Sequence, residues 1–334
     1  MTGGDGVVME PATARRATVL DFSDLEGWAE DDHGVAVDVF RVTCGALSGD
    51  WAGLAAQAAE VGRGAARTFF ERGFRPVMIE DGAPALLTGY YEPEVEGAPE
   101  PSSRFRVPLY RRPPEMPADR PWLTRAEIED GALARRGLEM AWVEDEVEAF
   151  FLQVQGSGRL RLPDGRVMRL GYAGKNGQPY SSVGRMAIAR GALPAEEATA
   201  DALRGWLRRN PGEGRALMRS NASFVFFREL DLPPEAGPLG TMGRPVTALR
   251  SLAVDPKVVP LGAPVWIEAN GAERLRRLMV AQDTGSAIQG AQRADIFVGT
   301  GEAAGLRAGR IRDGGRLVVL WPATSIPEDW AGPS

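Results

Sequence analysis

The chain has 334 residues, 44% of them hydrophobic and 25% charged, which suits a globular protein of one large or two ordinary domains with a real core. Its net charge of −6 argues against a nucleic-acid partner, because phosphates bind to a basic face. One cysteine and one histidine exclude a disulfide within the chain and a zinc site built from these residue types. The chemistry therefore has to rest on carboxylates, hydroxyls, amides, lysine or arginine.

The single histidine and the single cysteine are both expected to be structurally ordinary. His33 stands in the acidic run 30–34, which favours a solvated loop histidine over a member of a Ser-His-Asp triad. Cys44 follows Arg41-Val-Thr43, which is not a lipobox, so we expect a small buried side chain rather than a lipid anchor. The N-terminal residues lack the pattern of a signal peptide, and no run of about 18 apolar residues predicts a membrane span.

In chain order, residues 1–25 read as an irregular lead-in. Apolar spacing then predicts helix from 48 to 73, with Ser48 or Asp50 as its cap. Strands are predicted at 75–79 and 85–91, around the turn Asp81-Gly82.

The middle of the chain opens with a proline-dense segment, residues 93–121, which predicts a long crossover into a second domain. Thr124 and Glu127 form a capping box at the start of a short helix. The remaining predictions for this region are a helix at 144–149, a strand at 150–155, a hairpin at 160–168 turned by Pro163-Asp164-Gly165, and helices near 182–190 and 196–208.

Beyond about residue 221 the chain is rich in short apolar runs separated by Gly and Pro. Six such strands in about 100 residues predict a compact β-barrel. They lie at 223–227, 250–254, 264–268, 278–282, 294–298 and 316–321. The glycines of 299–305 are one residue too widely spaced for a dinucleotide fingerprint, so we interpret them as a turn into a helix.

Three aspartates in this last third are candidates for chemistry. Asp255 and Asp283 stand beside Pro and near Gly, where an aspartate is usually a turn former, although a function for either stays open. Asp295 lies inside an apolar strand with no Gly or Pro next to it. A strand disfavours Asp, and a buried carboxylate costs free energy unless it is paired or used, so function is the better interpretation of Asp295.

Several motifs, taken together and in order, resemble the membrane-bound lytic murein transglycosylase A family, over roughly residues 40–334. The motifs are Thr88-Gly-Tyr-Tyr-Glu-Pro93, Phe151-Leu-Gln-Val-Gln-Gly-Ser-Gly158, Tyr172-Ala-Gly-Lys-Asn-Gly177, Tyr180-Ser-Ser-Val-Gly184, Asn221-Ala-Ser-Phe-Val-Phe-Phe227 and the three-aspartate segment 250–301.

This resemblance implies a mainly β fold with helices, in which a double-psi β-barrel carries an inserted smaller β-rich domain. The expected division is 1–92 plus 222–334 for the discontinuous barrel domain with its N-terminal helices, and 93–221 for the insert. A glycan groove is expected between them. No metal or organic cofactor is implied.

The resemblance also implies the reaction, the cleavage of the β-1,4 bond between N-acetylmuramic acid and N-acetylglucosamine in peptidoglycan with formation of a 1,6-anhydro ring. Asp295 matches the family's catalytic aspartate, and Asp283 is expected to support it. Hydroxyl, phenol, amide and ammonium groups suited to sugar contacts are expected to bind the glycan. They belong to Thr88, Tyr90, Gln155, Ser157, Lys175 and Asn176.

Two other functions stay open at this point. A peptidoglycan hydrolase would use Asp283 or Asp255 to activate water, and a cell-wall-binding protein would have no activity. The expected partner is the peptidoglycan glycan strand, with other cell-wall enzymes as a further candidate and a monomer as the expected state. The function implies the periplasm or the outer membrane as the location.

Overall fold

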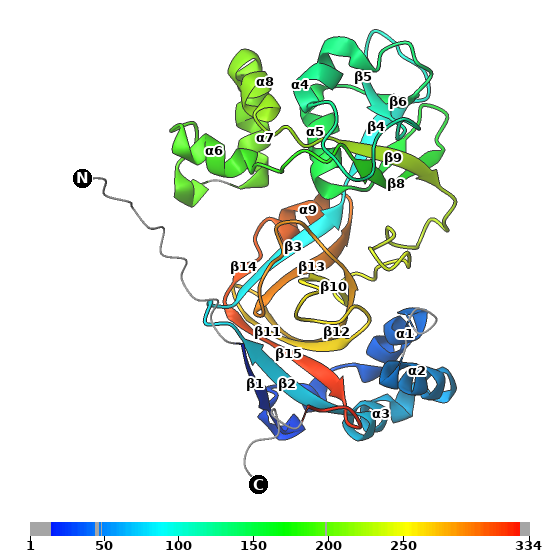
Figure 1. The fold of residues 1–334 in the computed structure, drawn as a ribbon, viewed down its shortest axis with the longest axis vertical. Coiled ribbons are helices and arrows are strands. Elements are labelled where there is room, and N and C mark those ends of the chain that lie inside the picture. Colours follow the sequence, from blue (N-terminus) through cyan, green and yellow to red (C-terminus); the bar gives the residue numbers. More distant parts are fainter. Residues whose placement is uncertain (1–14, 44–46, 48, 198, 328–334) are drawn as a thin grey trace, which may run out of the picture.

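The computed structural model describes residues 15–43, 47, 49–197 and 199–327, and these form two lobes (Figure 1). The lobe drawn below in that view, called the barrel lobe here, contains strands β1–β3 and β10–β15 together with helices α1–α3 and α9. The lobe above it, called the insert lobe, contains β4–β9 and α4–α8. Segments from both ends of the chain therefore build one lobe, and the middle builds the other.

The barrel lobe is made from one nine-stranded sheet in the order β1-β2-β15-β11-β12-β10-β13-β3-β14. Two neighbouring pairs, β10–β12 and β13–β3, are parallel, and the other pairs are antiparallel. In Figure 1 strands β3, β13, β10 and β12 curve around one another into a barrel. The strands are β1 Arg16–Val19, β2 Phe74–Glu80, β3 Leu86–Glu92, β10 Ser251–Val254, β11 Pro264–Asn270, β12 Arg274–Asp283, β13 Arg293–Thr300, β14 Arg312–Asp313 and β15 Gly315–Pro322.

Part of this sheet is covered on both faces. The inner face fills the barrel with side chains such as Leu252, Val265 and Ile296, all fully buried. The outer face of β11, β12 and β15 buries Trp266 and Leu278 against the N-terminal helices. Burial on both faces explains why the strand runs are continuously apolar instead of alternating.

The predicted helix 48–73 is divided in the structure. Helix α2, Asp50–Glu60, ends at Val61, and a 3-10 turn separates it from α3, Ala66–Gly73. The break falls at Gly62 and Gly64, because glycine is among the residues least suited to a helix interior. Ser48, a candidate cap, and Cys44, expected to be a small buried side chain, lie outside the described residues.

The prediction for His33 is wrong, because His33 begins a helix, α1 His33–Thr43, and is only 5% exposed. Its ring makes a T-shaped contact with the ring of Trp28, with the ring centroids 4.3 Å apart, and its Nε2 atom has no partner among the described residues. The preceding Asp31 accepts two hydrogen bonds from the buried guanidinium of Arg250. The acidic run was therefore misread, since tertiary pairing buries part of it.

We expect His33 to make the protein less stable in mild acid. Burial lowers the pKa of His33 from its usual 6.5. The negative charge of Asp31 raises this pKa, and the positive charge of Arg67 lowers it further. A lowered folded-state pKa means that the unfolded chain binds the proton first, so stability falls as the pH drops below about 6.5. Urea unfolding at several pH values should give a steeper acid loss for the wild type than for His33→Gln. Parallel curves for the two proteins would contradict this expectation.

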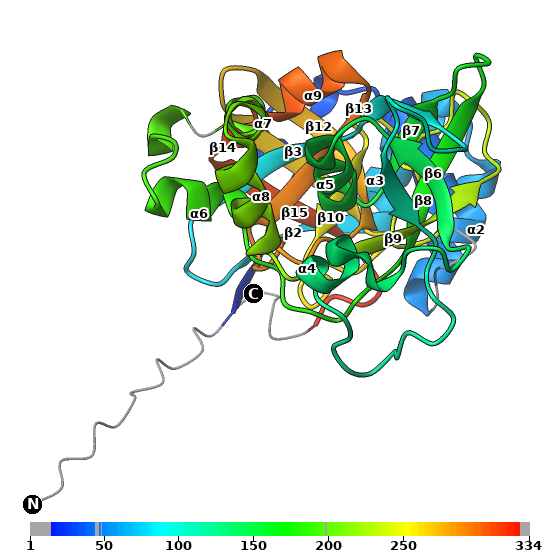
Figure 2. The same ribbon diagram turned by 90° about the horizontal axis from the view of Figure 1, so that it is seen from above.

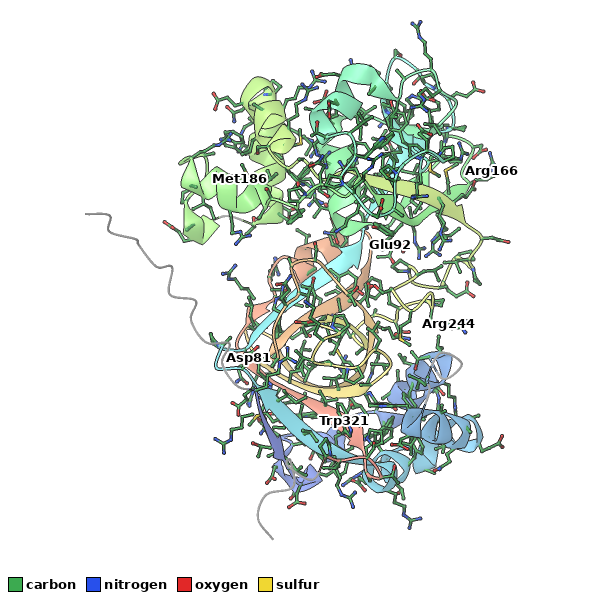
Figure 3. All side chains as sticks on the ribbon, in the orientation of Figure 1. Asp81, Glu92, Arg166, Met186, Arg244 and Trp321 are labelled. Atoms are coloured by element: carbon green, nitrogen blue, oxygen red, sulfur yellow. The ribbon has the colours of Figure 1, made fainter. Side chains whose placement is uncertain are left out.

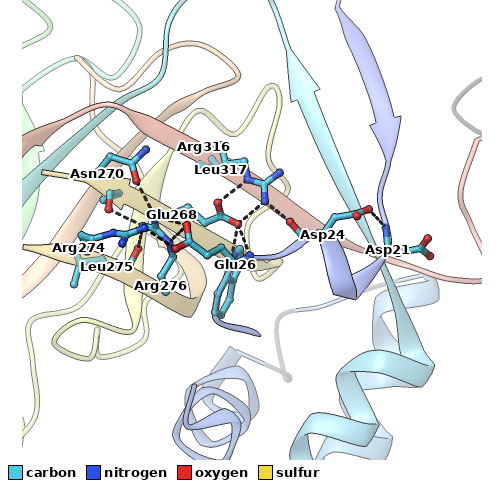
Figure 4. Close-up of polar contacts among 12 residues, drawn as sticks. Asp21, Asp24, Glu26, Glu268, Asn270, Arg274, Leu275, Arg276, Arg316 and Leu317 are labelled. Carbon is cyan, nitrogen blue, oxygen red and sulfur yellow. Dashed lines mark hydrogen bonds and ion pairs between the residues drawn. The ribbon is translucent and has the colours of Figure 1, made fainter. Parts of the chain in front are cut away.

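The lead-in before α1 is more regular than predicted. Strand β1 pairs antiparallel with β2, and the following segment is tied to the barrel by an ion network (Figure 4). Glu268 accepts hydrogen bonds from Arg316 Nε at 2.8 Å and from the backbone N–H of Glu26 at 3.1 Å, while Arg276 Nε donates to Glu26 at 2.9 Å. Each of these charged groups is paired, so the network holds the segment on the barrel.

The insert lobe is built on a six-stranded sheet in the order β5-β6-β4-β7-β8-β9. Seen from above, helices α6–α8 lie to one side of it and α5 lies between them and the strands (Figure 2). The elements are β4 Glu94–Ala98, β5 Val107–Tyr110, α4 Arg125–Glu127, β6 Glu139–Val143, α5 Glu146–Gln155, β7 Gly158–Arg161, β8 Val167–Lys175, α6 Val183–Ala189, α7 Ala200–Arg209, α8 Pro211–Arg219 and β9 Val225–Leu230.

Two assignments in this lobe need correction. Residues 150–155 form the second half of helix α5 rather than a strand, because Asp145 caps its start through the Glu148 N–H and Gly156 ends it in the left-handed conformation. The run 223–227 contributes to β9, which pairs with β8 in the insert sheet. It is therefore not a barrel strand, although the other five predicted runs are.

Other local predictions are confirmed. Thr124 and Glu127 form the predicted capping box, and the hairpin of β7 and β8 turns through Asp164 and Gly165. Gly301 precedes helix α9, Glu302–Ala308, as the turn interpretation of 299–305 requires. Helix α8, which was not predicted, follows Asn210. Within the described ranges, no helix has the length and apolar character needed to cross a membrane.

The two lobes are joined through a buried ion network at Glu92, which Figure 3 labels between them. The Glu92 side chain is 1% exposed and accepts hydrogen bonds from Arg159 Nε at 2.7 Å, Arg169 Nη2 at 3.1 Å and Thr300 Oγ1 at 2.9 Å. Both arginines also donate to backbone carbonyls of residues 233–236. The end of β3, the insert sheet and the returning chain therefore meet at one carboxylate.

Candidate active site

The outer face of the barrel brings Thr88 and Asp295 together. Side chains alternate along β3, so Leu87 fills the core while Thr88 and Tyr90 point outward. The parallel pairing of β3 with β13 sets Thr88 opposite Asp295, and the Thr88 hydroxyl donates to Asp295 Oδ1 at 2.5 Å. Two predicted site residues 207 positions apart thus share one hydrogen bond.

Asp283 lies two strands away on the same side of the sheet. Ala253 of β10 stands between them in register, opposite Asp295 on one side and Asp283 on the other. Strands lie about 4.8 Å apart, which sets the two aspartate backbones roughly 10 Å from each other. The phenol of Tyr90 reaches across and donates to Asp283 Oδ2 at 3.1 Å. Four of the predicted site residues therefore form one cluster.

The surroundings of Asp295 favour its protonated form more than water does. Burial raises the pKa of its carboxyl, the Thr88 hydrogen bond and the positive charge of Arg293 lower it, and the nearby Asp283 raises it further. The net direction is upward from 3.8. Among the described residues, the one side chain that donates a hydrogen bond to Asp295 is Thr88, and this bond together with the charge of Arg293 does not offset the effect of burial.

Asp283 has a different environment, although burial also raises its pKa. Its Oδ1 accepts hydrogen bonds from the Thr241 N–H at 2.8 Å, the Thr241 hydroxyl at 2.8 Å and the Thr284 N–H at 2.9 Å, in addition to the Tyr90 bond on Oδ2. All four bonds lower the pKa of Asp283 by favouring the anion. The two carboxyls are thus unequal, with Asp283 the better anion and Asp295 the better acid.

Thr241 was missed by the sequence analysis. It lies in the returning segment, where Gly240 packs so close to β12 that a Cβ atom there would lie 2.6 Å from the Gln282 carbonyl oxygen. That approach carries the Thr241 hydroxyl to Asp283, 42 residues further along the chain. The glycine was a weak signal for a close backbone contact, but nothing in the sequence identified its partner.

Tyr90 combines packing with polar contact. Its ring lies 5.3 Å from the ring of Phe297, which is buried beside it on β13. Burial is the first reason why the pKa of Tyr90 is raised well above 10.0, and the charges of Asp283 and Asp295 add to it. Tyr90 therefore stays a neutral phenol that can donate a hydrogen bond.

The predicted contacts of the insert lobe lie on two separate segments. Gln155 is the last residue of α5, and Ser157 follows it after the left-handed Gly156. This turn adjoins the crossover between the lobes, since the neighbouring Arg159 N–H donates to the Pro93 carbonyl at 2.8 Å. Lys175 ends β8 and is exposed. Within the described structure, no polar contact occupies the side chains of Gln155, Ser157 or Lys175.

Asn176 is corrected from a glycan contact to a structural residue. Its side chain is 1% exposed and donates to the carbonyls of Leu123 and Ala222, at 2.7 and 2.8 Å. Its amide oxygen accepts from the N–H groups of Phe224 and Gln178. The amide has therefore filled its hydrogen-bonding capacity inside the insert lobe and has none left for a sugar.

Asp255 has the turn-forming role that its position beside Pro256 indicated. Its Oδ1 accepts the N–H of Lys257 at 3.0 Å, and its Oδ2 accepts the N–H of Gly290 at 2.9 Å. These bonds connect two loops of the barrel. Across the described ranges, no group of three His, Cys, Asp or Glu side chains is arranged to hold a metal ion.

A cavity of about 420 Å³ opens between the lobes on the other face of β3. Tyr91 lines it, and Tyr91 points away from Thr88 and Tyr90 because neighbouring strand residues face opposite sides. Arg204 of α7 crosses it to donate to the Tyr91 hydroxyl at 2.7 Å. This cavity is therefore separate from the aspartate cluster.

The fold and the cluster define a class of protein, a mainly β double-psi barrel that carries an inserted smaller β-rich domain and an unequal pair of partly buried carboxyls. Residues 86–228 match the MltA specific insert domain, and residues 250–321 match the 3D domain. The chain is 35% identical to the membrane-bound lytic murein transglycosylase A of Vibrio cholerae over 74% of its own length and 68% of the relative's. The chain belongs to the membrane-bound lytic murein transglycosylase A family.

Solved structures of relatives agree with this assignment. The membrane-bound lytic murein transglycosylase of Agrobacterium tumefaciens is 33% identical, with a TM-score of 0.83 over 92% of this chain and 98% of that one. MltA of E. coli with bound chitohexaose is 30% identical, with a TM-score of 0.71 over 92% of this chain and 91% of that one. The expected family and fold class are confirmed.

Proposed function

We propose that this protein is a lytic transglycosylase that cleaves the β-1,4 bond between N-acetylmuramic acid and N-acetylglucosamine in peptidoglycan and forms 1,6-anhydro-N-acetylmuramic acid. The names of the relatives and the chitohexaose bound to the E. coli relative support a glycan substrate of this kind. The observation that carries the proposal is the unequal carboxyl pair: burial raises the pKa of both, but Asp283 accepts four hydrogen bonds that favour its anion, whereas Asp295 accepts one side-chain hydrogen bond, from Thr88.

One residue is sufficient for this chemistry. Protonated Asp295 donates its proton to the glycosidic oxygen as the bond to the anomeric carbon breaks. The 6-hydroxyl of the same muramic acid residue attacks that carbon, and ionised Asp295 takes the hydroxyl proton. The leaving sugar gains one proton, the anhydro ring forms, and the enzyme returns to its starting state. No water is consumed, which separates the reaction from hydrolysis.

The other residues of the cluster hold this arrangement. Thr88 orients Asp295. Tyr90 and Thr241 donate hydrogen bonds that favour the anion of Asp283, and its charge would favour a protonated Asp295 and stabilise positive charge on the sugar. Gln155, Ser157 and Lys175 offer amide, hydroxyl and ammonium groups to the glycan from the insert lobe. No cofactor takes part.

We also propose the division of the chain into a barrel domain, built from both ends of the chain, and an insert that begins at residue 93, with the glycan held between them. The expected second boundary, between 221 and 222, moves beyond β9, because Val225–Leu230 pairs with β8 in the insert sheet. The crossover at Pro93 and the match to the insert family from residue 86 support the first boundary. The membrane-bound relatives support a place in the periplasm at the outer membrane. We further propose that the protein acts as a monomer and that it meets other cell-wall enzymes on its substrate.

Digestion of purified sacculi followed by mass spectrometry tests the reaction. Anhydro-muropeptides, each one water lighter than the corresponding hydrolysis product, are the expected result. Muropeptides with reducing ends would contradict the proposal and indicate hydrolysis, in which Asp283 activates the water. Binding to sacculi without release of product would leave a cell-wall-binding protein.

The pH dependence of kcat/KM should report Asp295. Activity requires its protonated form, so it is lost as the pH rises through a pKa that burial holds above 3.8. The Thr88 hydrogen bond favours the anion, so Thr88→Val should raise this pKa further and move the alkaline limb to higher pH. Thr88→Ser keeps the hydroxyl and should leave the limb in place. An unmoved limb in Thr88→Val would show that another group sets it.

A further inference from the structure

We propose that Arg312, with Arg293 beside it, binds a carboxylate on the lactyl branch of the muramic acid residue next to Asp295. This inference rests on the proposed function, and it assigns to the site a preference for a charged substituent that the reaction itself does not require. The group that Arg312 would bind is a carboxylate, and the substrate can supply it from two places. It belongs to the lactyl group where the glycan carries no peptide, and to the stem peptide where one is attached.

The sheet places Arg312 in line with the reacting residues. Strand β14 is the last strand of the barrel sheet and pairs antiparallel with β3, with Arg312 opposite Thr88. Directly paired residues point to the same face, so Arg312, Thr88 and Asp295 form one row across β14, β3 and β13. With strands about 4.8 Å apart, the row places the Arg312 backbone roughly 10 Å from that of Asp295.

The Arg312 guanidinium is available to a ligand. The residue is exposed, and no hydrogen bond or ion pair links its side chain to the rest of the described chain. The next residue, Asp313, does not neutralise it, because Asp313 is paired with the core residue Leu87 and its carboxylate lies against Gly271. An arginine left without a partner at the edge of a site is a binding group for anions.

Arg293 adds a second positive charge to the same face. It lies two residues before Asp295 on β13, and its guanidinium donates to the Leu86 carbonyl at 3.2 Å. Burial has the largest influence on the pKa of Arg293 and lowers it. The negative charge of Asp295 raises this pKa, and the positive charge of the neighbouring Arg312 lowers it. The strand register thus places Arg312 on the β3 and β14 side of Asp295, toward which Arg293 also points, and Asp283 on the opposite side, beyond β10.

Only one of the two sugars at the cleaved bond carries a lactyl group. Muramic acid bears it on the ring whose anomeric carbon reacts, so the lactyl carboxylate or the peptide attached to it lies close to the acid. Contact with Arg312 would set the orientation of the strand, because N-acetylglucosamine has no charge to offer. The arginine would therefore distinguish muramic acid from N-acetylglucosamine next to Asp295.

The test measures binding in an Asp295→Asn background, which prevents turnover. Dissociation constants are compared for peptide-bearing glycan strands, for strands freed of peptide by an amidase, and for neutral chitohexaose. Arg312→Gln removes the charge at similar length, Arg312→Lys keeps it, and Arg310→Gln is a matched control. Arg310 is an exposed arginine two positions earlier, and its side chain takes no part in the site.

We expect Arg312→Gln to weaken binding of one or both carboxylate-bearing strands roughly tenfold, with a shallower salt dependence, and to change chitohexaose binding less than twofold. Arg312→Lys should recover part of the loss, and Arg310→Gln should lose nothing. The strand that loses affinity identifies the source of the carboxylate. Equal losses on all three ligands, or none on either charged strand, would overturn the inference. A wild-type protein that releases no anhydro product would overturn the proposed reaction instead, since these constants do not depend on turnover.

Discussion

Asp295→Asn should reduce the release of anhydro-muropeptides from sacculi by roughly 10³-fold or more, since one group would lose both its acid and its base role. The amide has the size of the carboxyl and can still accept the Thr88 hydroxyl, so the geometry is kept while the proton is lost. Mass spectrometry of the digest at equal enzyme concentration is the measurement. Asp283→Asn is the informative comparison, because a supporting residue should cost less than the acid itself.

Asp295→Asn should also leave the fold intact and make it more stable. Burial raises the pKa of Asp295 above 3.8, which means that its ionised form is worse tolerated in the folded protein than in the unfolded chain. This cost is present at neutral pH and disappears as the pH falls, so removal of the charge should raise the unfolding temperature at pH 7. A stable Asp295→Asn protein with unchanged turnover would remove Asp295 from the mechanism.

Glu92→Ala should lower the free energy of unfolding by about 3–5 kcal/mol, the cost of leaving buried charges without their partner. Glu92 is 1% exposed, and its loss would leave Arg159 and Arg169, 13% and 5% exposed, without their shared carboxylate. Urea unfolding followed by tryptophan fluorescence and by far-UV circular dichroism gives the measurement. Transitions that separate in the two signals would indicate that the lobes no longer unfold together.

Glu94→Ala is the matched control for this prediction. Glu94 is the same residue type two positions later, but it lies 3.4 Å from Arg161, and the two side chains are 29% and 58% exposed. An exposed pair contributes about 0–1 kcal/mol, so the control should unfold close to the wild type. Equal losses in the two variants would show that the Glu92 network is no stronger than a surface ion pair.

Local patterns in the sequence predicted much of the barrel. The runs at 264–268 and 294–298 became β11 and β13 because they are too short and too apolar for a surface helix, and glycines and prolines end them. Thr124 with Glu127 and Asp164 with Gly165 act on their own neighbours in the chain, so their effect could be read without the fold. Asp295 stood out for the same reason, as a carboxyl inside an apolar strand.

Residues whose role depends on distant partners could not be assigned in this way. The run 150–155 fits a helix or a strand equally well by its hydrophobicity, and α5 was decided by its caps at Asp145 and Gly156 and by packing against the insert sheet. His33 was misread because the residues that bury it, Trp28 and Phe70, belong to other segments.

The sequence by itself determined the kind of fold, the family motifs and the one carboxyl that is out of place in its strand, because these depend on short-range patterns of hydrophobicity and turn formation. Only the tertiary structure decided which groups surround that carboxyl. Strand register brought Thr88 and Arg312 into line with Asp295, and the returning segment carried Thr241 to Asp283. Register and loop approach join residues far apart in the chain, and their outcome depends on the packing of the whole barrel rather than on any local signal.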